Sequence, residues 1–292
     1  MHLMIAGLGL IGGSLALALH PFPGLTLTAI EPDPLTRGEA LRLGAVSACW
    51  EDARSAPVEE ADMLILCQHP RQAVDFVLAH GPRMKSGSCL SDVCGIKTPL
   101  YQAISSLDTP PFAYIGGHPM AGRERGGFAN ASADLFRGSH YILVPGPAPA
   151  PEAERLLRAL MTYAGVADFI VATPQEHDER IAYTSQLMHV LALALCDQHL
   201  LSVSQGFEGG SFRGATRVAA LDPQLWTDLF WDNRQALRSQ IIELQEKLDT
   251  YRQLLEGDSQ EALTRQLTLS SDRKKAFDRV SQLPLTRSPL FR

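Results

Sequence analysis

Three glycines near the N-terminus have a spacing that suits the binding of a dinucleotide. Gly7, Gly9 and Gly12 form a G-x-G-x-x-G motif between an apolar run and a helical pattern. In that setting the first glycine permits a tight turn, the second lets the backbone approach a pyrophosphate, and the third lets the helix pack closely on the strand. The N–H groups of the helix start, at Leu10 and Ile11, would then bind the anion. A glycine-rich turn of some other α/β protein is the alternative.

An acidic residue follows the glycines at the expected distance. Glu31 ends the second predicted strand, about twenty residues after the motif, where a carboxylate accepts hydrogen bonds from ribose hydroxyls. The same charge would repel a ribose phosphate, so the sequence favours NAD over NADP. Asp33 lies close by, which leaves open that Glu31 is an ordinary surface acid.

A histidine stands where a proton acceptor would be useful. The predicted strand 112–116 leads into Gly116-Gly117-His118-Pro119-Met120-Ala121-Gly122, and ligands of open α/β sheets bind beyond the carboxyl ends of the strands. An imidazole with an ordinary pKa of about 6.5 can accept a proton at neutral pH. His118 is therefore a candidate general base. The alternative is a loop histidine bonded to a neighbouring backbone group.

The elements that must position these residues alternate between strand and helix in the first half of the chain. This pattern predicts an α/β, Rossmann-type doubly wound parallel sheet over residues 1–170. The expected strands are 2–6, 25–30, 62–67, 88–93, 112–116, 141–144 and 169–171, and the expected helices are 11–20, 35–43, 70–78, 97–105 and 151–163.

From residue 171 to residue 292 the pattern is helical almost throughout. Apolar residues recur at helical spacing over 175–198 and over a long amphipathic run, 225–255, and a shorter helix is expected at 260–267. Asp222 and Pro223 are typical of a helix start. The second half therefore forms an all-α domain, and the last dozen residues are expected to fray.

Composition narrows the choice of partners and location. The chain of 292 residues carries a net charge of −6, which argues against nucleic acid and anionic membranes as partners. The five cysteines are scattered without a C-x-x-C pair, so no metal site is expected, and a reducing cytoplasm fits. The apolar run 3–19 has no basic residue before it and is interrupted by glycines, which argues against a signal peptide or a membrane span.

Four blocks in order along the chain resemble the prephenate/arogenate dehydrogenase family. They are Gly7 to Ala16, Ser91-Asp92-Val93 with Lys97, Gly116 to Gly122, and Ser211 to Ala219 followed by Asp222-Pro223; a looser block covers Ser185 to His189. The resemblance spans roughly residues 1–275, and the block around His118 is its most specific part. It implies a nucleotide-binding domain followed by a helical domain that forms a homodimer.

The resemblance also implies an activity and roles for individual residues. Members carry out the NAD-dependent oxidative decarboxylation of prephenate or arogenate, small anions of tyrosine biosynthesis. The residue matching His118 draws a proton from the ring hydroxyl, and the arginine matching Arg217 grips a substrate carboxylate. Further matches near the substrate are His189, Glu124, Trp226 and, more weakly, Arg213. Each has a plainer alternative: core packing for His189 and Trp226, and a solvated surface charge for the others.

The chain departs from the family pattern close to the substrate. Gly95 stands where the family usually has a serine whose hydroxyl bonds the histidine and the substrate, and Ser91 or Cys94 is a conceivable substitute. Gln186, Met188 and Gly214 replace a usual histidine, proline and acid. These changes suggest altered specificity or weaker activity and leave the nucleotide site intact.

Three other functions compete with this one. The first is a related cyclohexadienyl or aminodeoxyprephenate dehydrogenase with an altered substrate. The second is a β-hydroxyacid dehydrogenase, for which the expected lysine and asparagine helix block is missing. The third is a catalytically impaired nucleotide sensor, which the presence of both His118 and Arg217 argues against.

Overall fold

The computed structural model describes residues 1–123 and 125–281. Contacts divide the chain into two compact units, residues 1–233 and residues 234 onward. The sequence predicted a boundary after residue 170, and that boundary stays a prediction. No helix in the described part of the chain combines the length and apolarity that crossing a membrane requires.

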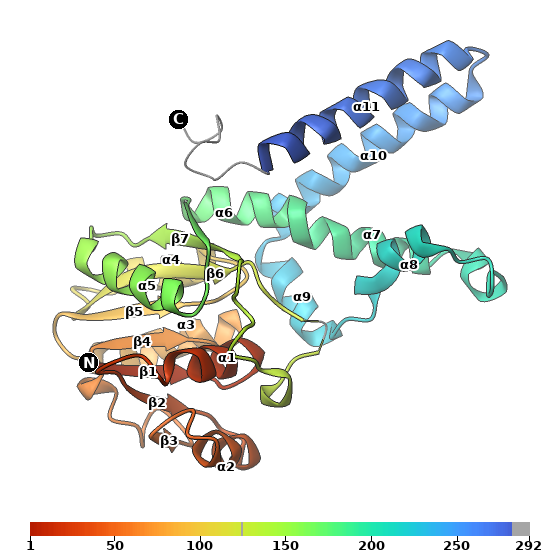
Figure 1. Cartoon of the computed structure of the whole chain (residues 1–292). Helices are drawn as coiled ribbons and strands as arrows, with labels where there is room; N and C mark the ends of the chain where they lie inside the picture. The colour runs from red at the N-terminus through yellow and green to blue at the C-terminus, as the bar shows by residue number, and fades with distance from the viewer. Residues whose placement is uncertain (124, 282–292) are drawn as a thin grey trace. The chain divides into compact units, whose positions relative to one another are not determined.

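A mostly parallel sheet forms the centre of the first unit (Figure 1). The described strands follow the order β3-β2-β1-β4-β5-β6-β7-β8. They are β1 (His2–Ala6), β2 (Thr26–Ile30), β3 (Ala48–Trp50), β4 (Met63–Leu66), β5 (Ser88–Asp92), β6 (Phe112–Pro119), β7 (His140–Pro145) and β8 (Asp168–Val171). Neighbouring strands are parallel except β6 and β7, which pair antiparallel. The order 3-2-1-4-5-6 is that of dinucleotide-binding domains, so the predicted fold class is confirmed.

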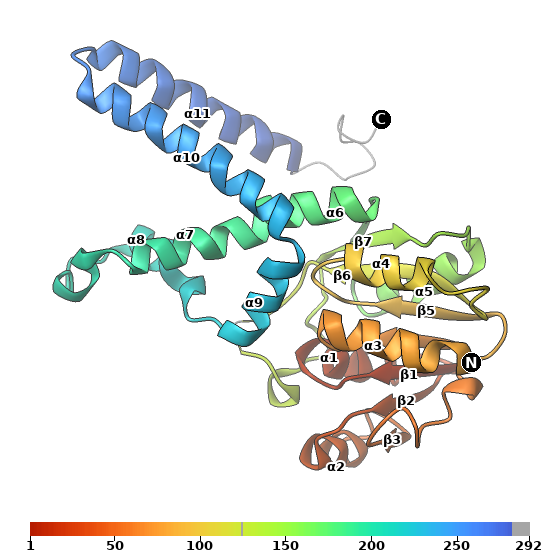
Figure 2. The same ribbon diagram turned by 180° about the vertical axis from the view of Figure 1, so that it is seen from behind.

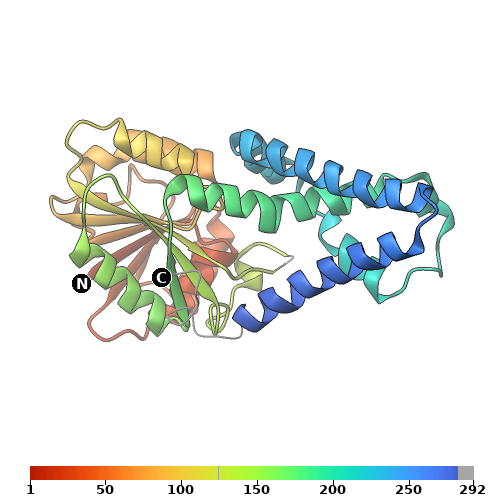
Figure 3. The same ribbon diagram turned by 90° about the horizontal axis from the view of Figure 1, so that it is seen from above.

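Helices cover both faces of the sheet, and Figures 2 and 3 show the three layers. These helices are α1 (Leu10–Leu19), α2 (Pro34–Arg42), α3 (Pro70–His80), α4 (Thr98–Ser105) and α5 (Pro151–Tyr163). Side chains of α1, α2 and α5 share one buried apolar cluster with alternate strand residues such as Ile5 and Ile65. Side chains of α3 and α4 share the other cluster with Met4 and Leu64. The near-continuous apolar strands are therefore buried on both faces.

Helices follow the sheet to the end of the described chain. They are α6 (Pro174–Ile181), a π-helical turn (Ala182–Gln186), α7 (Leu187–Cys196), α8 (Gly210–Thr216), α9 (Pro223–Asp232), α10 (Arg234–Glu256) and α11 (Gln260–Ser281). In the second unit, α10 and α11 lie side by side, and the Tyr251 hydroxyl and Ser270 Oγ are 2.9 Å apart.

The structure corrects several of the expected elements. β3 was not predicted because it has only three residues, and α8 was not predicted either. The last helix was expected to end at 267 but reaches Ser281. The expected single run 225–255 is two helices that separate at Asn233. Its apolar periodicity gives no sign of the break, which coincides with hydrogen bonds from the Asn233 amide to Asp178 O and Gln186 Oε1.

Candidate active site

The glycine loop between β1 and α1 depends on the absence of side chains at two positions. Gly7 has a φ of +95°, which L side chains rarely adopt, and its N–H donates to Ile30 O at 2.8 Å. A Cβ at Gly12 would lie 1.9 Å from Gly7 O. A Cβ at Gly9, in contrast, would meet no atom of the described residues within 4 Å. The loop is thus closely packed at both ends and open in the middle.

The start of α1 suits an anion. Gly9 is its N-cap, no side chain of the described structure caps it, and its first turn holds no acidic residue. The first N–H groups of a helix have no partner within the helix and carry the positive end of its dipole. The N–H groups of Leu10 and Ile11 are therefore placed to receive a pyrophosphate.

Glu31 lies beside this loop and braces it. Its Oε2 accepts the Leu8 N–H at 2.7 Å and its Oε1 accepts the Asp33 N–H at 3.0 Å. Only 9% of the residue is exposed, so it is no ordinary surface acid. Asp33 instead caps α2 by accepting the Thr36 N–H at 2.8 Å. Each Glu31 oxygen keeps a lone pair for a further donor such as a ribose hydroxyl. The loop, the helix start and this carboxylate together fit a dinucleotide.

His118 lies near the carboxyl end of β6, as the sequence predicted. The strand runs to Pro119 rather than stopping at Gly116, because it pairs with β7 and His118 stands opposite Ile142. The imidazole is partly buried, and its Nδ1 lies 2.8 Å from His177 Nε2. Burial, followed by the positive charge of Lys97 and by the neighbouring imidazole of His177, lowers the pKa of His118 well below 6.5. The ring is therefore neutral at physiological pH and able to accept a proton.

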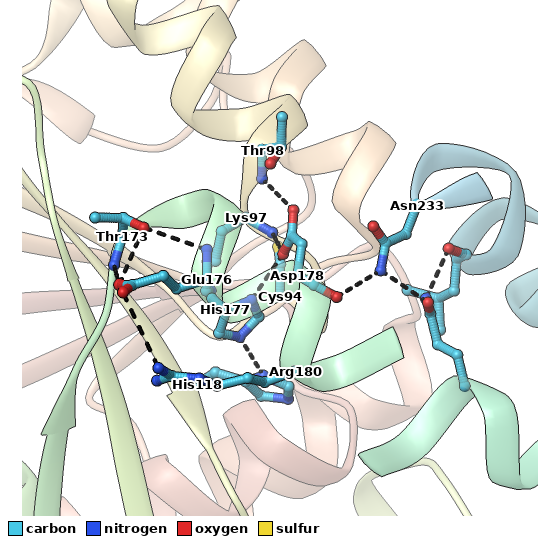
Figure 4. A network of polar contacts seen from close by, with 12 residues as sticks. Cys94, Lys97, Thr98, His118, Thr173, Glu176, His177, Asp178, Arg180 and Asn233 are labelled. Carbon is cyan, nitrogen blue, oxygen red and sulfur yellow. Dashed lines mark hydrogen bonds and ion pairs between the residues drawn. The ribbon is translucent and has the colours of Figure 1, made fainter. Parts of the chain in front are cut away.

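The histidine partner comes from α6 and was not predicted. Figure 4 shows His118, His177 and Asp178 in one chain of contacts. His177 Nδ1 lies 2.7 Å from Asp178 Oδ1. The carboxylate also accepts the backbone N–H groups of Lys97 at 2.8 Å and Thr98 at 2.9 Å, at the start of α4. One chain of polar groups thus joins β6, α6 and α4.

A buried ion pair supports the strand that carries His118. Lys97 Nζ donates to Asp92 Oδ1 and to Gly117 O, and both charged side chains are fully buried. The Tyr114 hydroxyl donates to Asp92 Oδ2 at 2.7 Å. Breaking a buried pair leaves an uncompensated charge, so these contacts constrain the backbone next to His118.

A second group of candidate residues gathers on α7 and α9. The rings of His189 and Trp226 stack with centroids 3.6 Å apart, and His189 Nδ1 donates to Ser185 O at 3.0 Å. Arg217 is exposed at the end of α8, and its charge contributes to a lowered pKa of His189, after burial. The structure thus brings His189, Trp226 and Arg217 together. Whether Arg217 and His118 converge on one ligand stays a prediction.

Two ion pairs hold α9 against the nucleotide-binding part. Arg71, in the first turn of α3, contacts Asp228 at 2.7 Å and Asp232 at 3.2 Å. Because α9 also carries Trp226, this contact joins the helix that bears the stacked rings to α3.

The structure shows which residues surround the positions that depart from the family pattern. Among the described residues, a Cβ at Gly95 would meet only Leu229, at 3.6 Å, so a larger residue fits there. Neither proposed substitute reaches His118, since the buried Ser91 hydroxyl has no partner among the described residues and the Cys94 thiol faces Gln68 O. Gln186 is buried and donates to Leu229 O at 2.9 Å. Glu124 lies outside the described residues.

Sequence reasoning missed His177 and Asp178, although a signal was present. Thr173-Pro174-Gln175-Glu176 is a capping box, with mutual bonds between Thr173 and Glu176. Such a motif marks the first turn of a helix. The adjacent His-Asp pair therefore had to lie at a helix start, directly after the last strand of the sheet.

Comparison with known proteins matches both halves of the chain to one family. A family model described as "Prephenate dehydrogenase, nucleotide-binding domain" matches residues 15–167, and "Prephenate dehydrogenase, dimerization domain" matches residues 173–269. Prephenate dehydrogenase of Bacillus subtilis is 30% identical over 278 residues, which are 92% of this chain and 74% of that protein. Cyclohexadienyl dehydrogenase of Zymomonas mobilis is 30% identical over 248 residues, 81% of this chain and 82% of that protein.

Two solved structures share the fold of this chain. Arogenate dehydrogenase of Synechocystis superposes with a TM-score of 0.80 at 27% identity, and the match covers 95% of this chain and 100% of that one. Prephenate dehydrogenase of A. aeolicus, solved with hydroxyphenyl propionate and NAD+, shares the fold with a TM-score of 0.84 at 23% identity, covering 95% and 98%. A family model matches each half of the chain, and a relative is 30% identical over 92% of this chain. This chain therefore belongs to the prephenate dehydrogenase family.

Proposed function

We propose that the chain catalyses the NAD-dependent oxidative decarboxylation of prephenate or arogenate. Its family membership supports this reaction class, and relatives named for prephenate, cyclohexadienyl and arogenate dehydrogenase support the substrate type. The observation that carries the proposal is the position of the His118 imidazole near the carboxyl end of β6, with its Nδ1 2.8 Å from His177 Nε2. That edge of a parallel sheet is where ligands bind.

The glycine loop supplies the cofactor site. Gly7 and Gly12 hold the turn, Gly9 leaves room for the pyrophosphate, and the N–H groups of Leu10 and Ile11 bind it. Glu31 accepts the ribose hydroxyls and disfavours a phosphorylated ribose. NAD, when bound, supplies the hydride acceptor.

His118 handles the proton of the ring hydroxyl. As the C–H bond at the hydroxyl-bearing carbon breaks and its electron pair leaves as hydride, His118 takes the hydroxyl proton. The ring carboxylate then leaves as carbon dioxide, and the electron pair of the broken C–C bond makes the ring aromatic. The proton returns to the phenolate oxygen, so the imidazole ends neutral. A positioned general base contributes about 10²–10⁴-fold to the rate of such a step.

Arg217 and His189 are proposed to bind the substrate anion. A guanidinium stays charged and can make two parallel hydrogen bonds to a carboxylate. His189 donates from Nδ1 to Ser185 O, so the Nε2 of its neutral ring can only accept, which suits a hydroxyl of the substrate rather than its carboxylate. We further propose a homodimer formed through the helical part, because the dimerization-domain model covers residues 173–269.

The test is a rate measurement with purified full-length chain. NAD with prephenate or arogenate is expected to yield NADH and an aromatic product, and His118→Asn is expected to lower kcat about 100-fold or more while the Kd for NAD is unchanged. NAD binding without turnover of either substrate would contradict the proposed activity and favour a sensor. Turnover only of a ring-amine analogue would replace the substrate and keep the reaction class.

A further inference from the structure

We propose that His177 and Asp178 are positioning residues that hold His118 in the tautomer with its proton on Nδ1 and its lone pair on Nε2. The proposal deepens, and rests on, the function proposed above. It follows from the order of donors and acceptors along one chain of contacts, which starts at the N-terminus of α4 and ends at β6 (Figure 4).

Asp178 is the fixed end of this chain. Its two oxygens accept the backbone N–H groups of Lys97 and Thr98, which are otherwise unpaired donors at the start of α4. Burial alone would raise the pKa of Asp178, but hydrogen bonds from His177 and Thr98 outweigh burial and lower it. The group is therefore an anion, and an ionised carboxylate can only accept hydrogen bonds.

That anion determines the tautomer of His177. The His177 side chain is completely buried, and its Nδ1 lies 2.7 Å from Asp178 Oδ1. Because the oxygen can only accept, Nδ1 must carry a proton. Burial outweighs the carboxylate and lowers the pKa of His177, so the ring is neutral. A neutral imidazole with a proton on Nδ1 has an acceptor at Nε2.

The same argument about donors and acceptors applies to His118. Its Nδ1 lies 2.8 Å from the acceptor Nε2 of His177, so Nδ1 donates and carries the single proton of the neutral ring. The other charge that acts on this ring comes from Lys97, which is paired with the buried Asp92. The lone pair of His118 is thereby left on Nε2, the atom proposed to take the substrate proton.

The hydrogen bonds that join Asp178, His177 and His118 also stabilise the product of that proton transfer. When Nε2 of His118 gains a proton, both of its nitrogens become donors, and the Nδ1 donor already has a partner in His177 Nε2. Asp178 lies one ring further and offsets the positive charge. A base whose partner is already aligned requires little rearrangement in the transition state.

Two substitutions at residue 177 separate positioning from mere packing. His177→Phe removes the acceptor and keeps an aromatic ring, whereas the carbonyl of His177→Gln can still accept from His118 Nδ1. His177→Phe is expected to lower kcat about 10–100-fold with the Kd for NAD unchanged, and His177→Gln to recover most of the loss. His140→Gln is the matched control, since His140 is a half-exposed histidine facing Asp168 at 3.8 Å on the neighbouring strand; it should keep the wild-type kcat.

A spectroscopic readout needs no turnover. In protein with ¹⁵N-labelled histidine, long-range ¹H–¹⁵N correlations identify which nitrogen of His118 is protonated, and His118→Asn assigns the signal. The expected wild-type form has the proton on Nδ1, and His177→Phe should shift the population toward Nε2. A wild-type proton on Nε2, or a His177→Phe variant with unchanged tautomer and kcat, would overturn the proposal. If the chain turned over neither substrate, the proposed function would fail, and the wild-type spectrum would still decide the tautomer.

Discussion

Gly117 stands directly before His118, and its substitution by alanine tests how tightly the strand is held. A Cβ at this position would lie 2.0 Å from Tyr141 Oη, 2.7 Å from Tyr141 Cζ and 2.8 Å from Asp92 O, whereas ordinary contacts are 3.4–4 Å. The clash comes from both neighbours, since Asp92 belongs to β5 and Tyr141 to β7. Lys97 Nζ also holds Gly117 O. The strand therefore has little freedom to move away.

The size of the effect follows from this geometry. Overpacking a well-filled core costs about 1–3 kcal/mol, and a shift of about 1 Å at a catalytic group can cost about 100-fold in rate. Gly117→Ala is therefore expected to lower the free energy of unfolding by about 2 kcal/mol and kcat by about 100-fold. Urea denaturation and NADH formation under saturating substrates measure the two quantities.

Two further variants make this prediction specific. Tyr141→Phe in the Gly117→Ala background removes the nearest atom and should recover part of the stability, because the Tyr141 hydroxyl has no hydrogen-bond partner among the described residues. Gly38→Ala is the control, because Gly38 is exposed on α2 and its Cβ would meet no described atom within 4 Å. This variant should be more stable by about 0.5–1 kcal/mol with kcat unchanged. Wild-type stability and rate in Gly117→Ala would refute the close packing of β6 against Tyr141 and Asp92.

Three more outcomes are expected. Burial lowers the pKa of both His118 and His177 in the folded chain. Below a pH of about 6.5, the unfolded chain therefore binds more protons than the folded chain. Their contribution to stability is complete above that pH and is lost below it, by about 1.4 kcal/mol per pH unit for each histidine. His177→Gln should reduce the slope of the unfolding free energy against pH by one proton, as measured by urea titrations at several pH values. The same slope as in the wild type would contradict the assignment of His177 as a neutral ring in the folded chain. Gly95→Ser should fold normally, since Leu229 is the only residue of the described part of the chain near the new Cβ. It should also raise kcat/KM, and an unchanged kcat/KM would place Gly95 away from the substrate. Arg217→Ala should raise KM about 10–100-fold through the loss of charged hydrogen bonds, and a larger rise in Arg213→Ala would move the role to Arg213.

Local rules explain why much of the fold was predictable. β1 and α5 have the bounds that the sequence indicated, because buried parallel strands and amphipathic helices carry their own periodicity. The glycine loop was recognisable because its geometry excludes side chains at two positions. Gly7 has a positive φ, and a Cβ at Gly12 would clash with Gly7 O. Asp222-Pro223 was recognised as a helix start, and Asp222 caps α9 by accepting the N–H groups of Gln224 and Leu225.

Elements that depend on distant contacts were not predictable in the same way. β3 is too short to have a periodicity and exists through its pairing with β2. The break between α9 and α10 coincides with bonds from Asn233 to Asp178 and Gln186, residues about fifty positions earlier in the chain. The amphipathic pattern continues through the break, because period and propensity describe only neighbouring turns.

The sequence by itself determined that a dinucleotide loop, a histidine at a strand end and a helical second half occur in one chain. Only the tertiary structure decided which groups face one another: His177 behind His118, Asp178 behind His177, and the start of α4 behind Asp178. The physical reason is that a residue's type fixes what it can donate or accept, whereas its protonation state depends on burial and on partners 59 to 81 positions away in the chain.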